Sequence, residues 1–142
     1  MIIEPFKPEH VRLIDVQAEQ SLELSYFDNS EYLNALAQAD SWTGWIDGRV
    51  VGCAGTITLW PGRHQSWALI SATIGPSGMV QFTRAVSRAL KLKQGRVELV
   101  VSAEFKQGHR WAKMLGFKLE TPEPMAQWFP EGGAASLYSR IQ

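Results

Sequence analysis

The sequence has a single cysteine, Cys53, so it cannot form an internal disulfide, and this sparing use of cysteine fits a reducing compartment. The histidines His10, His64 and His109 are scattered and have no cysteine partners at ligand spacing, which argues against a zinc site. No apolar run approaches the roughly 20 residues of a membrane span. Residues 1–7 lack a basic region followed by a long apolar stretch, so we expect no secretory signal and a cytoplasmic protein.

What the sequence does contain indicates a folded protein. Its 142 residues are 45% hydrophobic and include six Trp and six Phe, a composition that excludes disorder and collagen-like order. A chain of this length buries roughly two thirds of the surface that its unfolded form exposes. We therefore expect one domain over residues 1–142.

The net charge of zero conceals an uneven distribution of charge along the chain. Residues 1–48 carry nine acidic and two basic side chains, whereas residues 49–118 carry two acidic and eleven basic ones. This sorting indicates an anionic ligand for the middle segment, although two merely solvated faces explain it equally well. The basic residues are spread over several elements without a recognition motif, which argues against a nucleic-acid partner.

The first half of the chain predicts one strand and two helices before a hairpin. Pro8 and Glu9 are typical of a first helical turn, and Asn29 or Ser30 can cap a second helix. Asp47-Gly48 supplies the positive φ angles of a tight two-residue turn. The expected elements are a strand over 2–6, a helix carrying Val11, Ile14 and Ala18, a helix from 29 or 30, and strands over 42–46 and 50–57.

The second half alternates strands and helices. Ser77 can cap a helix that extends to about Lys93, and Gly116 can end a later one. The expected elements are strands over 67–74, 96–101, 117–120 and 136–141, with helices over 77–93 and 107–115. The long connection from Thr121 to Ala135 contains Met125, Trp128 and Phe129, which fit a lid, a patch for a protein partner or a small satellite core equally well. The result is an α/β (α+β) fold with one mixed sheet.

This order of elements, together with the run GHRWAKMLGF at residues 108–117, resembles the GNAT superfamily of acetyl-CoA-dependent N-acetyltransferases. The family's late helix typically ends in a Leu-Gly-Phe signature, as Leu115-Gly116-Phe117 does here. The resemblance implies a mostly antiparallel central sheet of about seven strands with about four helices on both faces. The RWAKMLGF part also resembles small GNAT-like proteins of short-tailed bacteriophages, at least one of which is treated as an internal virion or virion-assembly protein.

The resemblance also implies where coenzyme A would bind. In this family the sheet halves separate beside the fourth strand, the pantetheine arm bonds to that strand, here residues 71–74, and the pyrophosphate sits on amides at the next helix N-terminus, here residues 75–79. The implied coenzyme-binding residues are Ser71, Ala72, Thr73, Gly75, Ser77, Gly78 and Met79. The family's Gln/Arg-x-x-Gly-x-Gly/Ala pattern is degenerate here, because the leading Gln or Arg is missing and Pro76 removes an amide donor. An ordinary turn followed by a helix cap is the alternative.

Catalytic residues cannot be assigned from the sequence. The family commonly places a Glu on or near the fourth strand and a Tyr four residues before the signature glycine, but residues 67–74 contain no ionisable side chain and Ala112 occupies the tyrosine position. Glu104 and Tyr138 are the nearest substitutes for the base and acid of acetyl transfer. A solvated loop position for Glu104 and a packing role for Tyr138 are the alternatives.

Two functions follow from the resemblance. The first is an N-acetyltransferase that moves the acetyl group of its co-substrate acetyl-CoA to an amine on a small molecule or a protein. The second is a catalytically inactive GNAT-fold bacteriophage protein that acts in virion assembly or as an internal virion or binding protein, with a phage or host protein as partner. It would then occupy the host cytoplasm or the virion. A homodimer is compatible with either function.

Overall fold

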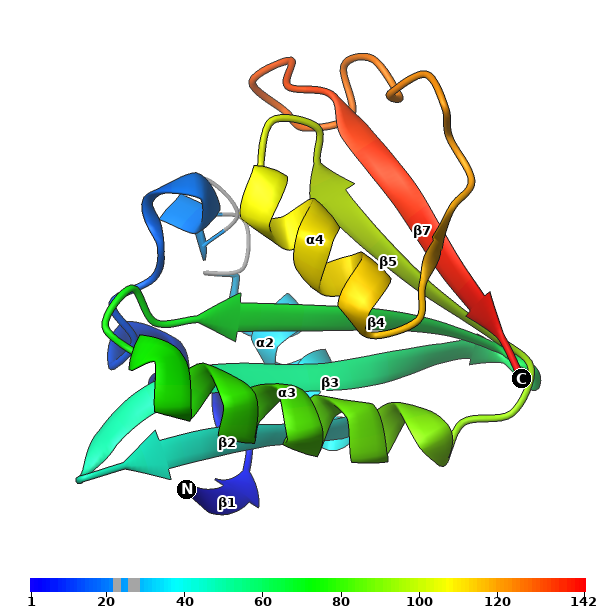
Figure 1. Cartoon of the computed structure of the whole chain (residues 1–142). Coiled ribbons are helices and arrows are strands. Elements are labelled where there is room, and N and C mark those ends of the chain that lie inside the picture. Colours follow the sequence, from blue (N-terminus) through cyan, green and yellow to red (C-terminus); the bar gives the residue numbers. More distant parts are fainter. Residues whose placement is uncertain (22–23, 26–28) are drawn as a thin grey trace. The chain divides into compact units, whose positions relative to one another are not determined.

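The computed structural model describes residues 1–21, 24–25 and 29–142 of the chain (Figure 1). Its strands are β1 (Ile2–Pro5), β2 (Asp40–Ile46), β3 (Arg49–Trp60), β4 (Arg63–Ile70), β5 (Arg96–Ser102), β6 (Lys118–Leu119) and β7 (Ala135–Ile141). Its helices are the 3-10 segments η1 (Pro8–Arg12) and η2 (Ala18–Gln20) and the α-helices α2 (Ser30–Gln38), α3 (Gly75–Lys91) and α4 (Lys106–Met114).

The strands form one mixed sheet of seven strands in the order β1-β2-β3-β4-β5-β7-β6. The pairs β1–β2, β2–β3, β5–β7 and β6–β7 are antiparallel, whereas β4 and β5 are parallel. The parallel ladder joins residues 63–65 to residues 96–98. The mostly antiparallel seven-stranded sheet predicted from the sequence is therefore confirmed. The described residues form three α-helices, where about four were predicted.

The chain divides into two compact units. The first unit comprises residues 1–57 and 66–89, and the second comprises residues 58–65 and 90–142. The first contains β1, β2, most of β3, η1, η2, α2 and most of α3. The second contains β5, β6, β7 and α4. Within the described residues no helix combines the length and apolar character needed to cross a membrane.

The β2–β3 hairpin of the first unit follows directly from its sequence. Asp47 and Gly48 adopt φ angles of 51° and 75°, as the tight turn requires. A β-bulge follows, because Trp45 pairs with Val50 while Gly44 pairs with Gly52, so that Val51 is the extra residue. The bulge shifts the alternation of β3, and as a result both Val50 and Cys53 point into the same core.

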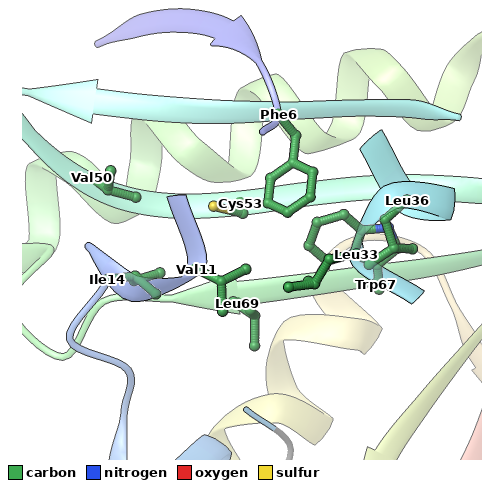
Figure 2. Close-up of a cluster of buried hydrophobic side chains, with 9 residues drawn as sticks. All are labelled: Phe6, Val11, Ile14, Leu33, Leu36, Val50, Cys53, Trp67 and Leu69. Atoms are coloured by element: carbon green, nitrogen blue, oxygen red, sulfur yellow. The ribbon is translucent and has the colours of Figure 1, made fainter. Parts of the chain in front are cut away.

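That core lies on the face of the sheet that carries η1 and α2 (Figure 2). Its buried side chains come from the loop after β1, from η1 and the turn after it, from α2, and from β3 and β4, and they are Phe6, Val11, Ile14, Leu33, Leu36, Val50, Cys53, Trp67 and Leu69. Helix α3 covers the opposite face of β2 and β3 (Figure 1). There the fully buried ring of Phe82 lies 5.1 Å from that of Trp42 and fills the space above Gly52 that any Cβ would occupy.

The predicted helix carrying Val11, Ile14 and Ala18 is wrong as one continuous helix. The structure has two short 3-10 segments instead, separated by Leu13–Gln17. The interruption has a tertiary cause, because Val16 forms an antiparallel bridge with Ser71 beyond the end of β4. Helix α2 follows the prediction, since the side chain of Asn29 accepts a hydrogen bond from Tyr32 N at 3.2 Å.

The predicted bounds of the strand over 67–74 and of the next helix also need correction. The strand begins at Arg63 and ends at Ile70, and the helix begins at Gly75, so that Ser77 lies in its first turn and does not precede it. The strand ends early because Ser71 Oγ accepts a hydrogen bond from Thr73 N at 3.1 Å and Ser71 O accepts one from Ile74 N at 3.3 Å. These bonds turn the chain before residue 74.

The second unit contains a buried charge. Glu98 on β5 is 4% exposed and receives hydrogen bonds from Arg63 Nε at 2.7 Å and from Arg96 Nε at 3.2 Å. Arg96 also pairs with Glu120 at 2.5 Å. Helix α4 ends where the sequence predicted, because Gly116 takes a φ of 89° and Phe117 N donates to Ala112 O.

Candidate functional site

The candidate site is the junction between β4 and α3 in the first unit. The chain leaves the sheet at Ser71, whose N–H donates to Val51 O on β3 at 2.9 Å. It then makes the short turn described above and enters α3 at Gly75, whose φ of 73° suits glycine far better than any residue with a Cβ. A Cβ at Gly75 would meet open space, so this glycine serves backbone conformation and leaves room beside the helix end.

The first turn of α3 offers few amides to an anion. An α-helix leaves about four N–H groups at its start without helical partners, and these attract negative charge together with the helix dipole. Counted from Ile74, they belong to residues 74–77. Ile74 N already donates to Ser71 O, and Pro76 has no N–H. Gly75 and Ser77 therefore supply the two amides of this turn that neither the helix nor the preceding turn engages in the described part of the chain.

The seven residues implied as coenzyme-binding do not share one environment. Ala72, Thr73, Gly75 and Ser77 are exposed, Met79 is half-buried, and Ser71 and Gly78 are buried. A Cβ at Gly78 would lie 2.8 Å from Ile74 Cγ1 and 3.2 Å from Ile46 Cδ1. Gly78 therefore lets the helix pack closely against those side chains. The structure gathers the exposed members of the set around Gly75, while their role toward a coenzyme stays a prediction.

The hydrogen-bonding edge of β4 that points away from β3 is engaged by residues 15–20. We call the main-chain groups Ala68 O, Ile70 N, Ile70 O and Ala72 N the β4 edge. Ala72 N donates to Asp15 O at 2.7 Å, and Gln17 N donates to Ile70 O at 3.3 Å. The buried side chain of Gln20 completes the set: its Nε2 donates to Ala68 O and its Oε1 accepts from Ile70 N, both at 3.0 Å.

No pattern in the sequence points to Gln20. A glutamine in a polar stretch carries no recognisable signal, and its partners are main-chain groups of a strand far along the chain. The antiparallel bridge between Val16 and Ser71 likewise has no local signature. In the structure, the Val16–Ser71 bridge coincides with the interruption of the predicted first helix.

The exposed side chains of Arg84 and Arg88 lie further along α3 in the same unit. They account for part of the basic excess in the middle of the sequence. Each is roughly two or more helical turns from Gly75, given about 1.5 Å of rise per residue. They are therefore positioned for long-range attraction of an anion rather than for contact at the first turn.

The candidate acid and base belong to the second unit. Glu104 is exposed in the turn before α4, and Ala112 is completely buried. Tyr138 is 1% exposed, its hydroxyl lies 2.7 Å from His109 Nδ1, and burial raises its pKa. His109 Nε2 lies 2.9 Å from Ala103 O, a pure acceptor, so Nε2 carries the proton and Tyr138 donates to Nδ1. This pair is a packed hydrogen-bonded contact within the second unit.

No group of three or more potential metal ligands occurs among the described residues. Cys53 is also inert, because burial raises the pKa of its thiol to about 11.

Comparison with known proteins shows the fold. No family model matches the sequence, and no curated protein matches it significantly. Solved structures are similar over almost their full length, including a GNAT-family acetyltransferase from Bacillus anthracis (12% identity, 98% of this chain and 93% of that one, TM-score 0.70) and Ard1 from Thermoplasma volcanium (14%, 99% and 96%, 0.75). A ribosomal-protein-alanine N-acetyltransferase from Brucella melitensis is also similar (11%, 100% and 100%, 0.70). The chain thus has the fold of GNAT-family acetyltransferases.

Proposed function

We propose that this chain is an N-acetyltransferase of the GNAT family, which transfers an acetyl group from acetyl-CoA to an amine. The observation that carries the proposal is the likeness of the whole chain to solved N-acetyltransferases, which extends through the β4–α3 junction. The resemblance of residues 108–117 to the family's late-helix signature supports it independently of the structure.

The junction fits part of the co-substrate. The amides of Gly75 and Ser77 would receive the diphosphate at the positive end of α3, and the open space beside Gly75 would let it approach the backbone. Acetyl-CoA supplies an activated thioester. The chain would then contribute mainly by positioning the two reactants, and by main-chain N–H groups that polarise the acetyl carbonyl.

A variant of Ser77 tests this assignment without disturbing the core. Ser77 is exposed in the first turn of α3, so Ser77→Asp adds a negative charge that favours the helix but repels a diphosphate. We expect acetyl-CoA to bind the variant at least about tenfold more weakly in isothermal titration. Asp at this position is preferable to Asp at Gly78, where the Cβ alone would collide with Ile74.

Ser77→Asn is the matched control, because it has nearly the same shape and no charge. Its affinity should stay within about twofold of wild type, since both variants keep the main-chain amide. Equal acetyl-CoA binding by the Asp variant, the Asn variant and the wild type would remove the diphosphate from this turn. Mass-spectrometric assay of acetyl transfer to polyamines and to peptides with free amino groups then tests the activity itself.

A second function is favoured by the missing acid and base. Buried Ala112 stands at the family's tyrosine position, and the hydroxyl of Tyr138 is occupied by His109. A GNAT-fold protein without chemistry, serving as a binding or assembly protein, fits these facts. The likeness of residues 110–117 to small phage proteins suggests a virion or an infected cell as its setting. Binding of coenzyme A without transfer to any amine would favour this second function.

The remaining expectations stay predictions. They are one domain over residues 1–142, a cytoplasmic location, an acceptor amine as the second substrate, and self-association or a phage or host partner. Size-exclusion chromatography with light scattering would give the oligomeric state, and the identity of the neighbouring genes would separate the enzyme from the virion protein.

A further inference from the structure

The β4 edge carries an alternating row of main-chain acceptors and donors, and the chain's own residues satisfy each of the four groups. Asp15 and Gln17 do so with main-chain groups, in the manner of a short antiparallel strand. Gln20 does so with a side chain, and its carboxamide presents to Ala68 O and Ile70 N the donor and acceptor that a peptide unit would present. A primary amide thus imitates one rung of a β-ladder.

We infer that Gln20 is an internal competitor for the pantetheine arm of coenzyme A, and that coenzyme binding requires its carboxamide to leave Ala68 O and Ile70 N. The inference rests on the proposed function, because acetyl-CoA is the competing ligand. The family resemblance expects this arm on residues 71–74, but β4 ends at Ile70 and Ala72 N is held by Asp15 O, so we place the arm on Ala68 and Ile70 of the strand itself. The arm is an extended chain with two secondary amides, each with one donor and one acceptor. Its amides and the carboxamide of Gln20 are chemically equivalent partners for the same strand edge.

The burial of Gln20 explains why its contact with β4 blocks the strand edge. Gln20 is 6% exposed, so its departure alone would leave a buried amide at Ile70 and a carbonyl at Ala68 without partners. A buried polar group without a partner costs considerably more than a normal hydrogen bond gains. Gln20 should therefore leave only when another amide takes its place, and hydrogen bonds are exchanged one for one.

Gln20 differs in this respect from its neighbours on the same segment. Asp15 and Gln17 bond through main-chain atoms that every residue possesses, so their side chains are replaceable. Only the contact of Gln20 depends on the identity of a side chain. A single substitution can consequently remove the internal competitor while the Val16–Ser71 bridge is retained.

The test is isothermal titration of acetyl-CoA into the full chain and its Gln20→Ala variant. We expect the variant to bind about tenfold more tightly, which is the size of one or two net hydrogen bonds that the ligand no longer displaces. Gln17→Ala is the matched control, because it removes the same side-chain type nearby and keeps the main-chain bond. Its affinity should stay within about twofold of wild type.

Amide hydrogen exchange at Ile70 supplies a readout without ligand. It should be slow in the wild type, faster in Gln20→Ala, and slow again when acetyl-CoA is added to the variant. Gln20→Met has a side chain of similar length that neither donates to Ala68 O nor accepts from Ile70 N, and it adds no charge, so it should also bind acetyl-CoA more tightly. This second variant decides the question if Gln20→Ala does not fold.

The outcomes separate this inference from the proposed function. Equal or weaker binding by the folded Gln20 variants, with wild-type binding intact, overturns the internal competitor and leaves the coenzyme site standing. Binding by the Gln20 variants but not by the wild type supports both. Absence of acetyl-CoA binding in every protein overturns both, and unchanged exchange at Ile70 in Gln20→Ala overturns the contact itself.

Discussion

The two compact units of this protein bury different kinds of polar group. Among the described residues of the first unit, the buried polar side chains are uncharged. His10 Nδ1 accepts a hydrogen bond from Lys7 N and lies 2.7 Å from Thr43 Oγ1, while the Gln20 carboxamide bonds to main-chain groups of β4. In the second unit Glu98 lies buried between Arg63 and Arg96. Where the chain is described, the first unit buries no charged side chain, whereas the second pairs its buried Glu98 with opposite charge.

This difference predicts that salt affects the stability of the two units differently, whereas acid lowers the stability of both. Neutral interiors depend on packing and are insensitive to salt, while an ion pair depends on the ionisation of its members. Acid should weaken both, the first because His10 must remain neutral and the second because Glu98 must remain charged.

Truncation in the apolar core of the first unit should cost the most. Leu36 is fully buried in the cluster of Figure 2, and Leu36→Ala should lower the free energy of unfolding by about 3 kcal/mol, because it removes buried apolar surface and leaves a cavity. Urea denaturation at several pH values measures the loss, which should not vary with pH. Leu92→Ala, at a position 82% exposed, should change stability by less than about 0.5 kcal/mol. Similar losses at both sites would contradict the assignment of the core.

Neutralisation of Glu98 should rank second and should depend on pH. Burial opposes ionisation of this carboxyl, but the hydrogen bonds from Arg63 and Arg96 outweigh it and hold the Glu98 pKa below its usual value. Glu98→Gln should cost about 2 kcal/mol at pH 7, less than for a fully buried pair because both arginines are partly exposed.

Acid should abolish this difference. A carboxyl with a lowered folded pKa stabilises the protein above its unfolded pKa and loses that contribution as the pH falls through the folded pKa. The stability curves of wild type and Glu98→Gln should therefore converge on acidification. Glu123→Gln, in the exposed loop before β7, is the control and should track the wild type throughout. Parallel curves for Glu98→Gln and wild type would show that folding does not shift the pKa of Glu98.

Loss of the Tyr138 hydroxyl should have a smaller effect. Tyr138→Phe removes one partly buried hydrogen bond to His109 Nδ1 and should cost about 1 kcal/mol. A double-mutant cycle with His109→Ala measures the coupling of the pair, for which we expect about 1 kcal/mol. Additive effects would show that the two side chains act separately. A specific loss of acetyl transfer with unchanged stability would instead return Tyr138 to the list of catalytic candidates.

Titration of His10 should have the smallest effect. Burial lowers the pKa of His10 below its usual 6.5, with only partial opposition from Glu9, so the folded protein binds fewer protons than the unfolded chain. Stability should consequently fall as the pH drops from 6.5 toward the folded pKa. His10→Asn keeps an acceptor for Lys7 N and should flatten this part of the pH profile, whatever its effect at neutral pH. An unchanged slope would assign the acid sensitivity to other groups.

Sequence reasoning predicted those elements whose signals are local. The Asp47-Gly48 turn, the Asn29 cap and the Gly116 stop each act within a few residues, and the structure confirms all three. The first helix was predicted wrongly because helical periodicity cannot register a competing bridge between Val16 and Ser71. The end of β4 was misplaced because the turn depends on the side chain of Ser71, which a strand pattern does not distinguish.

In the candidate site, too, the residues with local signals were predicted and those with distant partners were not. Gly75 was recognisable from the Gly-Pro pair and from the family resemblance, and the structure places it at the start of α3. The packing role of Gly78 and the contact of Gln20 with β4 depend on side chains and strands distant in sequence, so no local pattern contains them. Roles that depend on such distant partners become visible only in the structure.

The burial of Cys53 has a practical consequence for all of these experiments. Its sulfur is fully enclosed and held as the protonated thiol, so the folded chain presents no nucleophile to a maleimide. A cysteine introduced at an exposed position such as Ala126 would then be the sole labelling site. A fluorophore or spin label can therefore be attached at one chosen point without first removing the native cysteine.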